Sequence, residues 1–265
     1  MCLLVVLFRV DPAAPLVVAA NRDEYLARPA VAMTALGCGG PGPRILGGRD
    51  DVSGGTWLAV NDGGVVAGLT NRPLPDGPDR AKRSRGELPL RLASHRSAAA
   101  AVDAFVEGVR PTDYNPAWLL VGDRDQLFYV DVTSDHRVEV EELAPGVHVL
   151  ENRDLHDPSP KVERVRGLLA PLLDSGRDRL DRLADGLADL LRDHDLPPVD
   201  ERQAAETTRL GAAVRSICVH APDDDYGTRS SAIITVAADE HLEPDVRYTD
   251  GAPCHARWED ARHLW

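Results

Sequence analysis

The chain has 265 residues, of which 43% are apolar and 28% are charged, with a formal net charge of −13 and a pI near 5.1. This apolar fraction supports a sizeable core and excludes a disordered chain, and the negative charge argues against nucleic acid as a partner because phosphates would be repelled. The four cysteines and nine histidines show no CxxC, HxxxH or HExxH spacing, so we expect neither a disulfide scaffold nor a structural metal ion.

Two runs rich in Val and Leu, 2–10 and 15–21, predict a pair of buried strands joined by a turn. Cys2 heads the first run. If Met1 is removed, which the small side chain of Cys2 favours, the thiol and a free α-amine share one Cα atom. The amine has a pKa of roughly 7.7–8.0, so it can accept a proton near neutral pH and activate its own side chain. The alternative is that Cys2 is a small apolar side chain of the core.

This N-terminal run is neither a signal peptide nor a membrane span. It lacks a basic n-region, and Arg9 and Asp11 interrupt it early. No stretch of the chain approaches the roughly 18 apolar residues that a spanning helix needs. We therefore expect a cytoplasmic protein with no membrane insertion.

Four polar residues, Asn-Arg-Asp-Glu at 21–24, follow the second predicted strand and are expected at the edge of the sheet. If the first two strands form a hairpin, Cys2 lies opposite this end, within reach of Arg22 or Asp23. The alternative is a turn that ends the strand and carries an exposed ion pair, which contributes little to stability.

A Gly- and Pro-rich segment from 30 to 55 is predicted to be a long loop, and its length makes it a candidate for function. Strands at 57–60 and 65–70 follow as a hairpin, because the Asp-Gly pair between them supports the tight turn. Asn71 comes directly after this hairpin and precedes Arg72-Pro73, so its backbone is expected to leave the sheet there.

A helix is predicted from Ser84 to Gly108, with Ser84 and Glu87 spaced as a capping box. A basic run at 80–85 overlaps its start. As a structural feature this run is a solvated loop, and as a functional one it meets an anionic group on a substrate; the first interpretation is favoured.

The rest of the chain alternates strands with a block of helices. Strands are predicted at 117–122, 126–132, 137–143, 146–151, 214–219, 230–236 and 246–249, and helices at 162–173, 180–191 and near 200–210. No linker divides the sequence, so we expect one domain over 1–265. Strands at both ends with helices between them predict antiparallel sheets covered by helices, an α+β layered fold.

Two further positions carry polar side chains suited to chemistry. Asn152 lies just past a predicted strand, as Asn71 does, and an amide offers the N–H donors that an oxyanion hole needs. The alternative for each is an Asx turn. Arg229 enters a late strand beside Gly227 and is suited to a carboxylate, or it is an exposed loop arginine.

Five segments together resemble the NRDE family, also called transport and Golgi organisation protein 2-like. They are Met1-Cys2, Ala20-Asn21-Arg22-Asp23-Glu24, Arg28-Pro29, Gly54-Gly55-Thr56-Trp57-Leu58 and Tyr226-Gly227-Thr228-Arg229. The resemblance runs from residue 1 to about 236. The family in turn resembles cysteine-type N-terminal-nucleophile hydrolases, namely bile-salt hydrolases, penicillin V acylases and acid ceramidase-like amidases. This implies a four-layer αββα fold, two stacked antiparallel sheets flanked by helices, and an N-terminal cysteine exposed by processing.

The resemblance also implies roles for single residues. Cys2 matches the nucleophile, and Asp23 matches an aspartate that hydrogen-bonds near the amine of the nucleophile. Asn71 and Asn152 match asparagines of the oxyanion hole, and Arg229 matches a late arginine near the nucleophile. The candidate substrate-binding residues are Arg22, Trp57 and Arg72. One departure stands out: those amidases carry an arginine before their Asn-x-Asp, where this chain has Ala20.

The sequence therefore predicts an amidohydrolase or acyltransferase that acts on an amide or related acyl bond of a small molecule, without a cofactor. The alternative function is non-enzymatic carriage of haem or an acyl lipid in the same pocket, and a third possibility is a relic without activity. Haem carriage needs an axial ligand, and His148, His156, Cys218 and His220 form no recognisable haem-binding motif. A processed N-terminus separates the first two functions, because only catalysis requires it.

Overall fold

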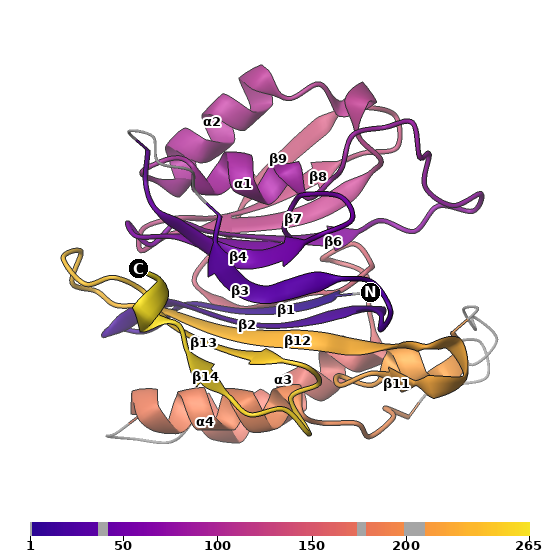
Figure 1. Ribbon diagram of the computed structural model, residues 1–265. Helices are drawn as coiled ribbons and strands as arrows, with labels where there is room; N and C mark the ends of the chain where they lie inside the picture. The colour runs from indigo at the N-terminus through magenta and orange to yellow at the C-terminus, as the bar shows by residue number, and fades with distance from the viewer. Residues whose placement is uncertain (1, 37–41, 174–178, 199–209) are drawn as a thin grey trace.

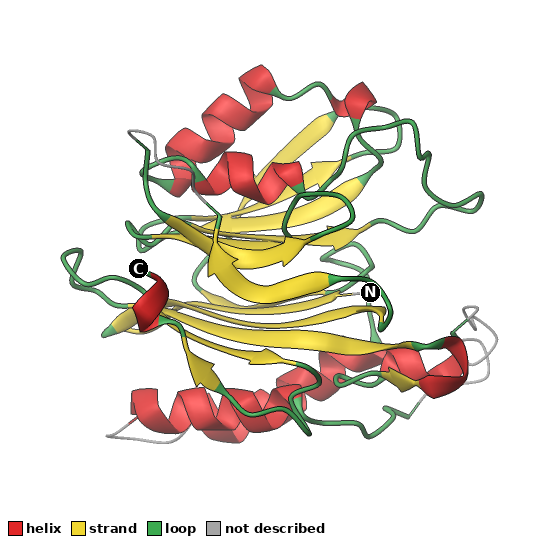
Figure 2. Ribbon diagram, in the orientation of Figure 1, coloured by secondary structure: helices red, strands yellow, loops and turns green. Residues whose placement is uncertain are grey.

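The computed structural model describes residues 2–36, 42–173, 179–198 and 210–265. Cys38 and most of the helical piece predicted near 200–210 lie outside the described residues. The chain forms four layers, with two stacked antiparallel sheets between two pairs of helices (Figure 1), as Figure 2 shows by secondary structure. The predicted αββα fold is confirmed.

The first sheet contains both the first and the last strand of the described chain. Its strands, in spatial order, are β10 (Gly146–Leu150), β1 (Cys2–Asp11), β2 (Ala14–Tyr25), β12 (Tyr226–Val236), β13 (Asp245–Asp250) and β14 (Glu259–Asp260), with β11 (His220–Ala221) paired to β12. The predicted hairpin is confirmed, since β1 pairs with β2. The long strands β1 and β2 occupy the middle of the sheet and are therefore covered on both faces.

The second sheet is a continuous meander. Its strands are β3 (Ala30–Ala35), β4 (Ile45–Asp50), β5 (Leu58–Asn61), β6 (Val66–Asn71), β7 (Ala117–Gly122), β8 (Leu127–Val132) and β9 (Val138–Glu142). Each strand pairs with the next one along the chain, and the longest connection, from β6 to β7, carries the helices that cover this sheet. The predicted hairpin at 57–70 and the strands from 117 to 143 are confirmed.

The apolar residues of β1 divide between two cores because successive side chains of a strand point to opposite faces. Leu4 and Val6 pack between the sheets, whereas Leu3 and Val5 pack under the outer helices. Burial on both faces explains why this segment is apolar without alternation.

Two pairs of helices form the outer layers. α1 (Glu87–Ala93) and α2 (Ala98–Gly108) cover the second sheet, and α3 (Pro160–Leu173) and α4 (Arg179–Leu191) cover the first. Four short 3₁₀ helices complete the described elements: η1 (Pro111–Asp113), η2 (Gly211–Arg215), η3 (Pro222–Asp224) and η4 (Arg262–Leu264). Within the described ranges, no helix combines the length and apolar character needed to cross a membrane.

Three predictions between residues 30 and 108 are wrong. The segment 30–55 is not a long loop, because it forms β3 and β4. The helix predicted over 84–108 is broken after Ala93, and Ser97 caps the second piece by accepting a hydrogen bond from Ala100 N at 3.2 Å. The capping box is absent, since the N-cap is Gly86, which has no side chain to accept a hydrogen bond.

Two further predictions near strand ends are also wrong. The segment 214–219 is not a strand: it contains part of η2 and an irregular stretch, whose apolar residues fill two different cores. The polar residues 21–24 do not end the second strand, because β2 continues to Tyr25 and pairs with β12 over its whole polar end.

Candidate active site

Cys2 begins β1, half-buried and directly opposite Arg22 of β2. Its backbone N–H donates to Asn152 Oδ1 at 2.7 Å. Asn152 follows β10 and in turn donates through Nδ2 to the backbone oxygen of Asn71, at 2.5 Å. Three residues separated by up to 150 positions therefore form one continuous chain of contacts.

This chain of contacts distinguishes the two asparagines. The side-chain amide of Asn152 is engaged at both ends, so its contacts support holding the Cys2 nitrogen rather than donating to an oxyanion. Asn71 ends β6, and its exposed side chain makes no hydrogen bond to any described residue. Asn71 is thus the better placed of the two to donate to a substrate oxygen.

Asp23 is only 2% exposed and lies on the face of β2 that turns toward the outer helices. Its Oδ1 accepts a hydrogen bond from Thr228 Oγ1 at 2.7 Å. Burial raises the pKa of Asp23, while the positive amino terminus and Lys161 oppose that rise. Lys161 of α3 is itself 3% exposed, a buried cation that no sequence motif marks.

The Cys2 thiol is electrostatically coupled to these groups. Burial raises the pKa of Cys2, the positive amino terminus lowers it, and the charge of Asp23 raises it again. Arg22 and the backbone N–H of Asp23 also favour the thiolate. Cys2 and Asp23 therefore lie close enough for the charge of Asp23 to shift the protonation of the thiol.

Arg22 faces the space between the two sheets, on the same side of β2 as Ala20. Its guanidinium lies against the ring of Trp57, with Cζ 4.2 Å from the ring centroid, and Nη2 lies 3.2 Å from Asp50 Oδ2. It is 4% exposed, and its Nη1 has no hydrogen-bond partner among the described residues. A buried N–H without a partner beside the candidate nucleophile is available to a ligand.

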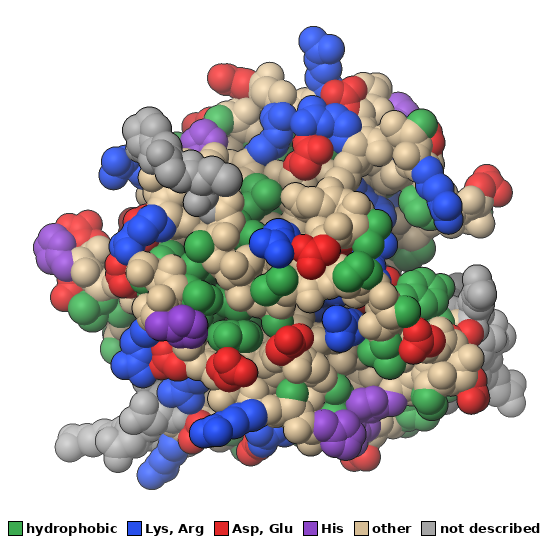
Figure 3. All heavy atoms as spheres, in the orientation of Figure 1, with side chains coloured by type: hydrophobic (Ala, Val, Ile, Leu, Met, Phe, Trp, Pro, Cys, Tyr) green, Lys and Arg blue, Asp and Glu red, His purple; other side chains and the backbone are tan. Residues whose placement is uncertain are grey.

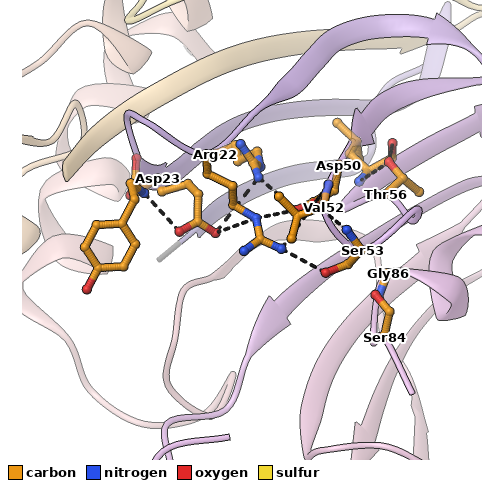
Figure 4. A network of polar contacts seen from close by, with 12 residues as sticks. Arg22, Asp23, Asp50, Val52, Ser53, Thr56, Ser84 and Gly86 are labelled. Carbon is orange, nitrogen blue, oxygen red and sulfur yellow. Dashed lines mark hydrogen bonds and ion pairs between the residues drawn. The ribbon is translucent and has the colours of Figure 1, made fainter. Parts of the chain in front are cut away.

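Asp50 holds this arrangement together, as Figure 4 shows. It accepts hydrogen bonds from Arg28 Nε at 2.7 Å and from the backbone N–H groups of Val52 and Ser53. Burial alone would raise the pKa of Asp50, but these hydrogen bonds, led by that from Arg28, keep the pKa below its usual value. Glu24 lies 3.9 Å from both arginines. Arg22 and Glu24 of the Asn-Arg-Asp-Glu motif thus form a network of ion pairs with Arg28 and Asp50 beside Cys2.

The Gly-Gly-Thr-Trp segment at 54–57 brings the backbone at Gly86 close to this network of ion pairs. Thr56 N donates to Gly86 O at 2.9 Å, and a Cβ atom on Gly55 would lie 2.5 Å from the carbonyl carbon of Gly86. The two backbones approach so closely that Gly55 has no room for a side chain. This contact fixes the segment before α1.

We expect Gly55→Ala to lower the free energy of unfolding by about 1–3 kcal/mol, because the methyl group forces the two backbones apart. Urea denaturation measures this loss. Gly167→Ala is the matched control, since Gly167 lies on an exposed face of α3 with open space around it, and alanine there raises stability by up to about 1 kcal/mol. Equal effects of the two substitutions would contradict the close contact.

Arg85 is held next to Gly86 and belongs to the basic run noted in the sequence. Its Nη1 donates to Pro116 O at 3.2 Å, and it makes no ion pair with any carboxylate in the described part of the chain. Burial lowers the pKa of Arg85, whereas the nearby charges of Cys2 and Glu24 raise it. A solvated loop is the favoured prediction for this run from the sequence, but Arg85 is partly buried within electrostatic reach of Cys2.

The remaining predicted site residues are less closely connected. Arg72 pairs with Asp131 at 3.1 Å and lies over Trp118. Arg229 occupies the bulge of β12 between Thr228 and Ser230. Among the described residues, no hydrogen bond joins either arginine side chain to Cys2, Asp23 or the two asparagines.

Comparison with known proteins places this geometry in context. The family model described as Transport and Golgi organisation 2 matches residues 1–245. The "Transport and Golgi organization protein 2 homolog" of Bos taurus is 32% identical over 98% of this chain and 97% of its own length, and that of Homo sapiens is 30% identical over 90% of each.

Two solved structures share the fold at 12% identity. The N-acylethanolamine-hydrolyzing acid amidase ortholog of Caenorhabditis elegans has a TM-score of 0.54 and covers 91% of this chain and 94% of its own. A variant of the conjugated bile acid hydrolase of Clostridium perfringens has a TM-score of 0.53 and covers 99% and 93%. At this identity the likeness concerns the fold alone.

Proposed function

The chain belongs to the transport and Golgi organisation 2 family, and from that premise we propose that it is a cysteine-type N-terminal-nucleophile amidohydrolase or acyltransferase acting on a small molecule. One observation carries the proposal: the backbone nitrogen of half-buried Cys2 is held by Asn152 Oδ1 at 2.7 Å. Once Met1 is removed, that nitrogen is the α-amine of Cys2. The solved amidases with this fold support the reaction class.

The first half of the reaction uses groups of Cys2 itself. The neutral α-amine takes the thiol proton, and the sulfur attacks the acyl carbon of the substrate. The carbonyl oxygen becomes an oxyanion, to which the Nδ2 of Asn71 donates. Asn152 holds the amine on one side, and the charge of buried Asp23, which interacts electrostatically with Cys2, would stabilise the amine when it is protonated.

The second half releases the products. The protonated amine returns its proton to the leaving nitrogen as the carbon–nitrogen bond breaks, which leaves a thioester on Cys2. Water attacks the thioester and yields an acid, or an amine attacks it and yields a new amide. In either case the attacking group loses a proton to the α-amine and the thiol is restored.

Two arginines near Cys2 indicate the substrate class. Arg22 has a buried Nη1 without a described partner, and Arg85 has no described carboxylate partner. Arg22 is paired with Asp50, but its unpaired buried N–H is costly, as is the partly buried guanidinium of Arg85 without a counter-charge; an anionic group on the ligand relieves both costs. The proposed substrate is therefore an amide or related acyl compound that carries a carboxylate or similar anion near the reacting bond.

Arg85→Gln is expected to raise KM for such an anionic substrate by about 10–100-fold, because a charged hydrogen bond contributes about 1.5–3 kcal/mol. For a neutral analogue KM changes little. Arg80→Gln is the matched control: it removes a charge from the same basic run at an exposed position. Steady-state kinetics on the substrate pair measure the difference, and equal effects at both positions would remove Arg85 from the site.

Capture of the acyl-enzyme tests the proposed function. Purified protein is incubated with a panel of N-acyl amino acids, N-acyl amines and aryl amides, then quenched in acid and examined by mass spectrometry. We expect a mass increase equal to the acyl group, located on the peptide containing Cys2 and removed by hydroxylamine. An acyl group found on no peptide, with lipid or haem bound without turnover, would support carriage and overturn the proposal.

A further inference from the structure

A second cluster of reactive side chains lies away from Cys2. His194, Cys218, His220 and Cys254 each offer a ligand atom, and these atoms all lie within 4.8 Å of one another. The residues come from the segment after α4, the segment that leads into β11, and the loop after β13. Figure 3 shows histidine side chains gathered on the lower part of the molecular face, near the position of β11 in Figure 1.

The separations in this cluster match a tetrahedral metal site. Zinc lies about 2.3 Å from cysteine sulfur and about 2.0–2.1 Å from histidine nitrogen, so a tetrahedral site separates two sulfurs by about 3.8 Å and a sulfur from a nitrogen by about 3.5 Å. Here Cys218 Sγ lies 3.7 Å from Cys254 Sγ and 3.5 Å from His220 Nε2. His220 Nε2 lies 3.2 Å from Cys254 Sγ.

Backbone contacts hold the ligand-bearing segments in place. Cys218 N donates to Asp193 O at 2.7 Å, which fixes the second segment to the residue before His194. Arg192 Nε donates to Pro253 O at 3.0 Å, which fixes the third segment at the residue before Cys254. The protein therefore brings the ligands together with contacts that do not involve the ligand side chains.

We propose that His194, Cys218, His220 and Cys254 bind one zinc ion in a closed tetrahedral site. Two thiolates and two imidazoles are a donor set that selects zinc, and four protein ligands leave no open position, which is typical of a structural ion. The sequence shows no metal-ligand spacing, because the four residues come from three segments and only Cys218 and His220 are near neighbours in the chain.

The site adjoins the candidate active site through Thr228. Thr228 Oγ1 accepts a hydrogen bond from Val219 N at 2.8 Å and donates to Asp23 Oδ1 at 2.7 Å. Val219 lies between the two ligands of the second segment. Bound zinc would thus hold Val219 in place. Val219 in turn orients the Thr228 hydroxyl, which donates to the carboxylate of Asp23.

Metal analysis of the full chain tests the proposal. Protein expressed in zinc-supplemented medium and passed through a desalting column is expected to retain one zinc per chain. Cys218→Ser and Cys254→Ser should each weaken zinc binding by more than about 100-fold, since loss of a group that merely supports a ligand costs 10–100-fold. His255→Ala is the matched control: its ring lies 5.8 Å from that of His220, outside the four ligands, so it should retain zinc.

Cobalt titration of the wild-type apoprotein keeps the test independent of how the variants fold. A tetrahedral site with two thiolates gives visible d–d bands and a thiolate-to-cobalt charge-transfer band that saturate at one equivalent, and zinc abolishes both. Cys2→Ala should give the same titration, which separates this site from the candidate nucleophile. Zinc below one-tenth equivalent without saturable cobalt bands, or a Cys218–Cys254 disulfide in freshly purified protein, would overturn the proposal.

Discussion

Replacement of Cys2 by alanine is expected to lower kcat by about 10⁴-fold or more, because it removes the atom that attacks the acyl carbon. The substitution keeps the small side chain that permits removal of Met1. It also keeps the α-amine and its hydrogen bond to Asn152, which involves the backbone nitrogen. Turnover of an amide identified by acyl capture measures the effect.

The same variant is expected to fold normally, since Cys2 is half-buried at the start of its strand and alanine leaves only a small gap. Thermal unfolding should therefore shift by only a few degrees. Cys2→Ser gives a second comparison: a hydroxyl is a much weaker nucleophile than a thiol in this setting, so serine should recover little of the rate. Undiminished turnover by Cys2→Ala would exclude Cys2 as the nucleophile.

Asp23→Asn is expected to lower kcat by about 10²-fold or more without loss of stability. The amide keeps the shape of the carboxylate and can still accept from Thr228 Oγ1, but it no longer offers a negative charge to the protonated amine of Cys2. Burial raises the pKa of Asp23, so its ionised form is disfavoured in the folded state. At neutral pH the substitution should leave the free energy of unfolding unchanged or slightly raise it.

Asp50→Asn is the matched control, because the sign of its pKa shift is opposite. The pKa of Asp50 is lowered by its hydrogen bonds, so its ionised form stabilises the fold above the usual carboxyl pKa, and that contribution is lost as pH falls through the lowered value. Urea denaturation at pH 7 should show a loss for Asp50→Asn and none for Asp23→Asn. If Asp23→Asn lowered the free energy of unfolding by as much as it raised the activation free energy of the reaction, Asp23 would be a purely structural residue.

The sequence predicted most of the layered fold because strong periodic signals marked its elements. Val- and Leu-rich runs identified β1 and β2, and the Asp-Gly turn identified β5 and β6. One failure, the loop predicted over 30–55, occurred where glycine replaces the usual strand residues. β4 contains Gly47 and Gly48, and a Cβ on Gly48 would lie 2.0 Å from the ring of Trp57. The glycines leave room for the ring of Trp57 against β4, a contact that the local sequence pattern does not reveal.

The sequence predicted only part of the candidate site, and it did so from single positions and family motifs instead of periodic patterns. Cys2, Asn71 and Asn152 were singled out by position and by family motifs, and the structure joins them by hydrogen bonds. The polar end of β2 was predicted at the edge of the sheet, with an exposed turn as the alternative, because charged residues are rarely buried unless a network satisfies them, and the Arg22–Asp50–Arg28 network spans two sheets. Arg85 gave only a weak signal, since its burial depends on the contact between Gly55 and Gly86.

The central claim is that Cys2 acts with a free α-amine of its own. Intact-mass measurement and N-terminal peptide mapping of protein purified from its native host test this most directly. We predict a mass lower than that of the full 265-residue chain by one methionine, and an N-terminal peptide that begins at Cys2 with an unmodified amine. Quantitative retention of Met1, or an acetylated Cys2, would contradict the claim, because the nitrogen held by Asn152 could then accept no proton.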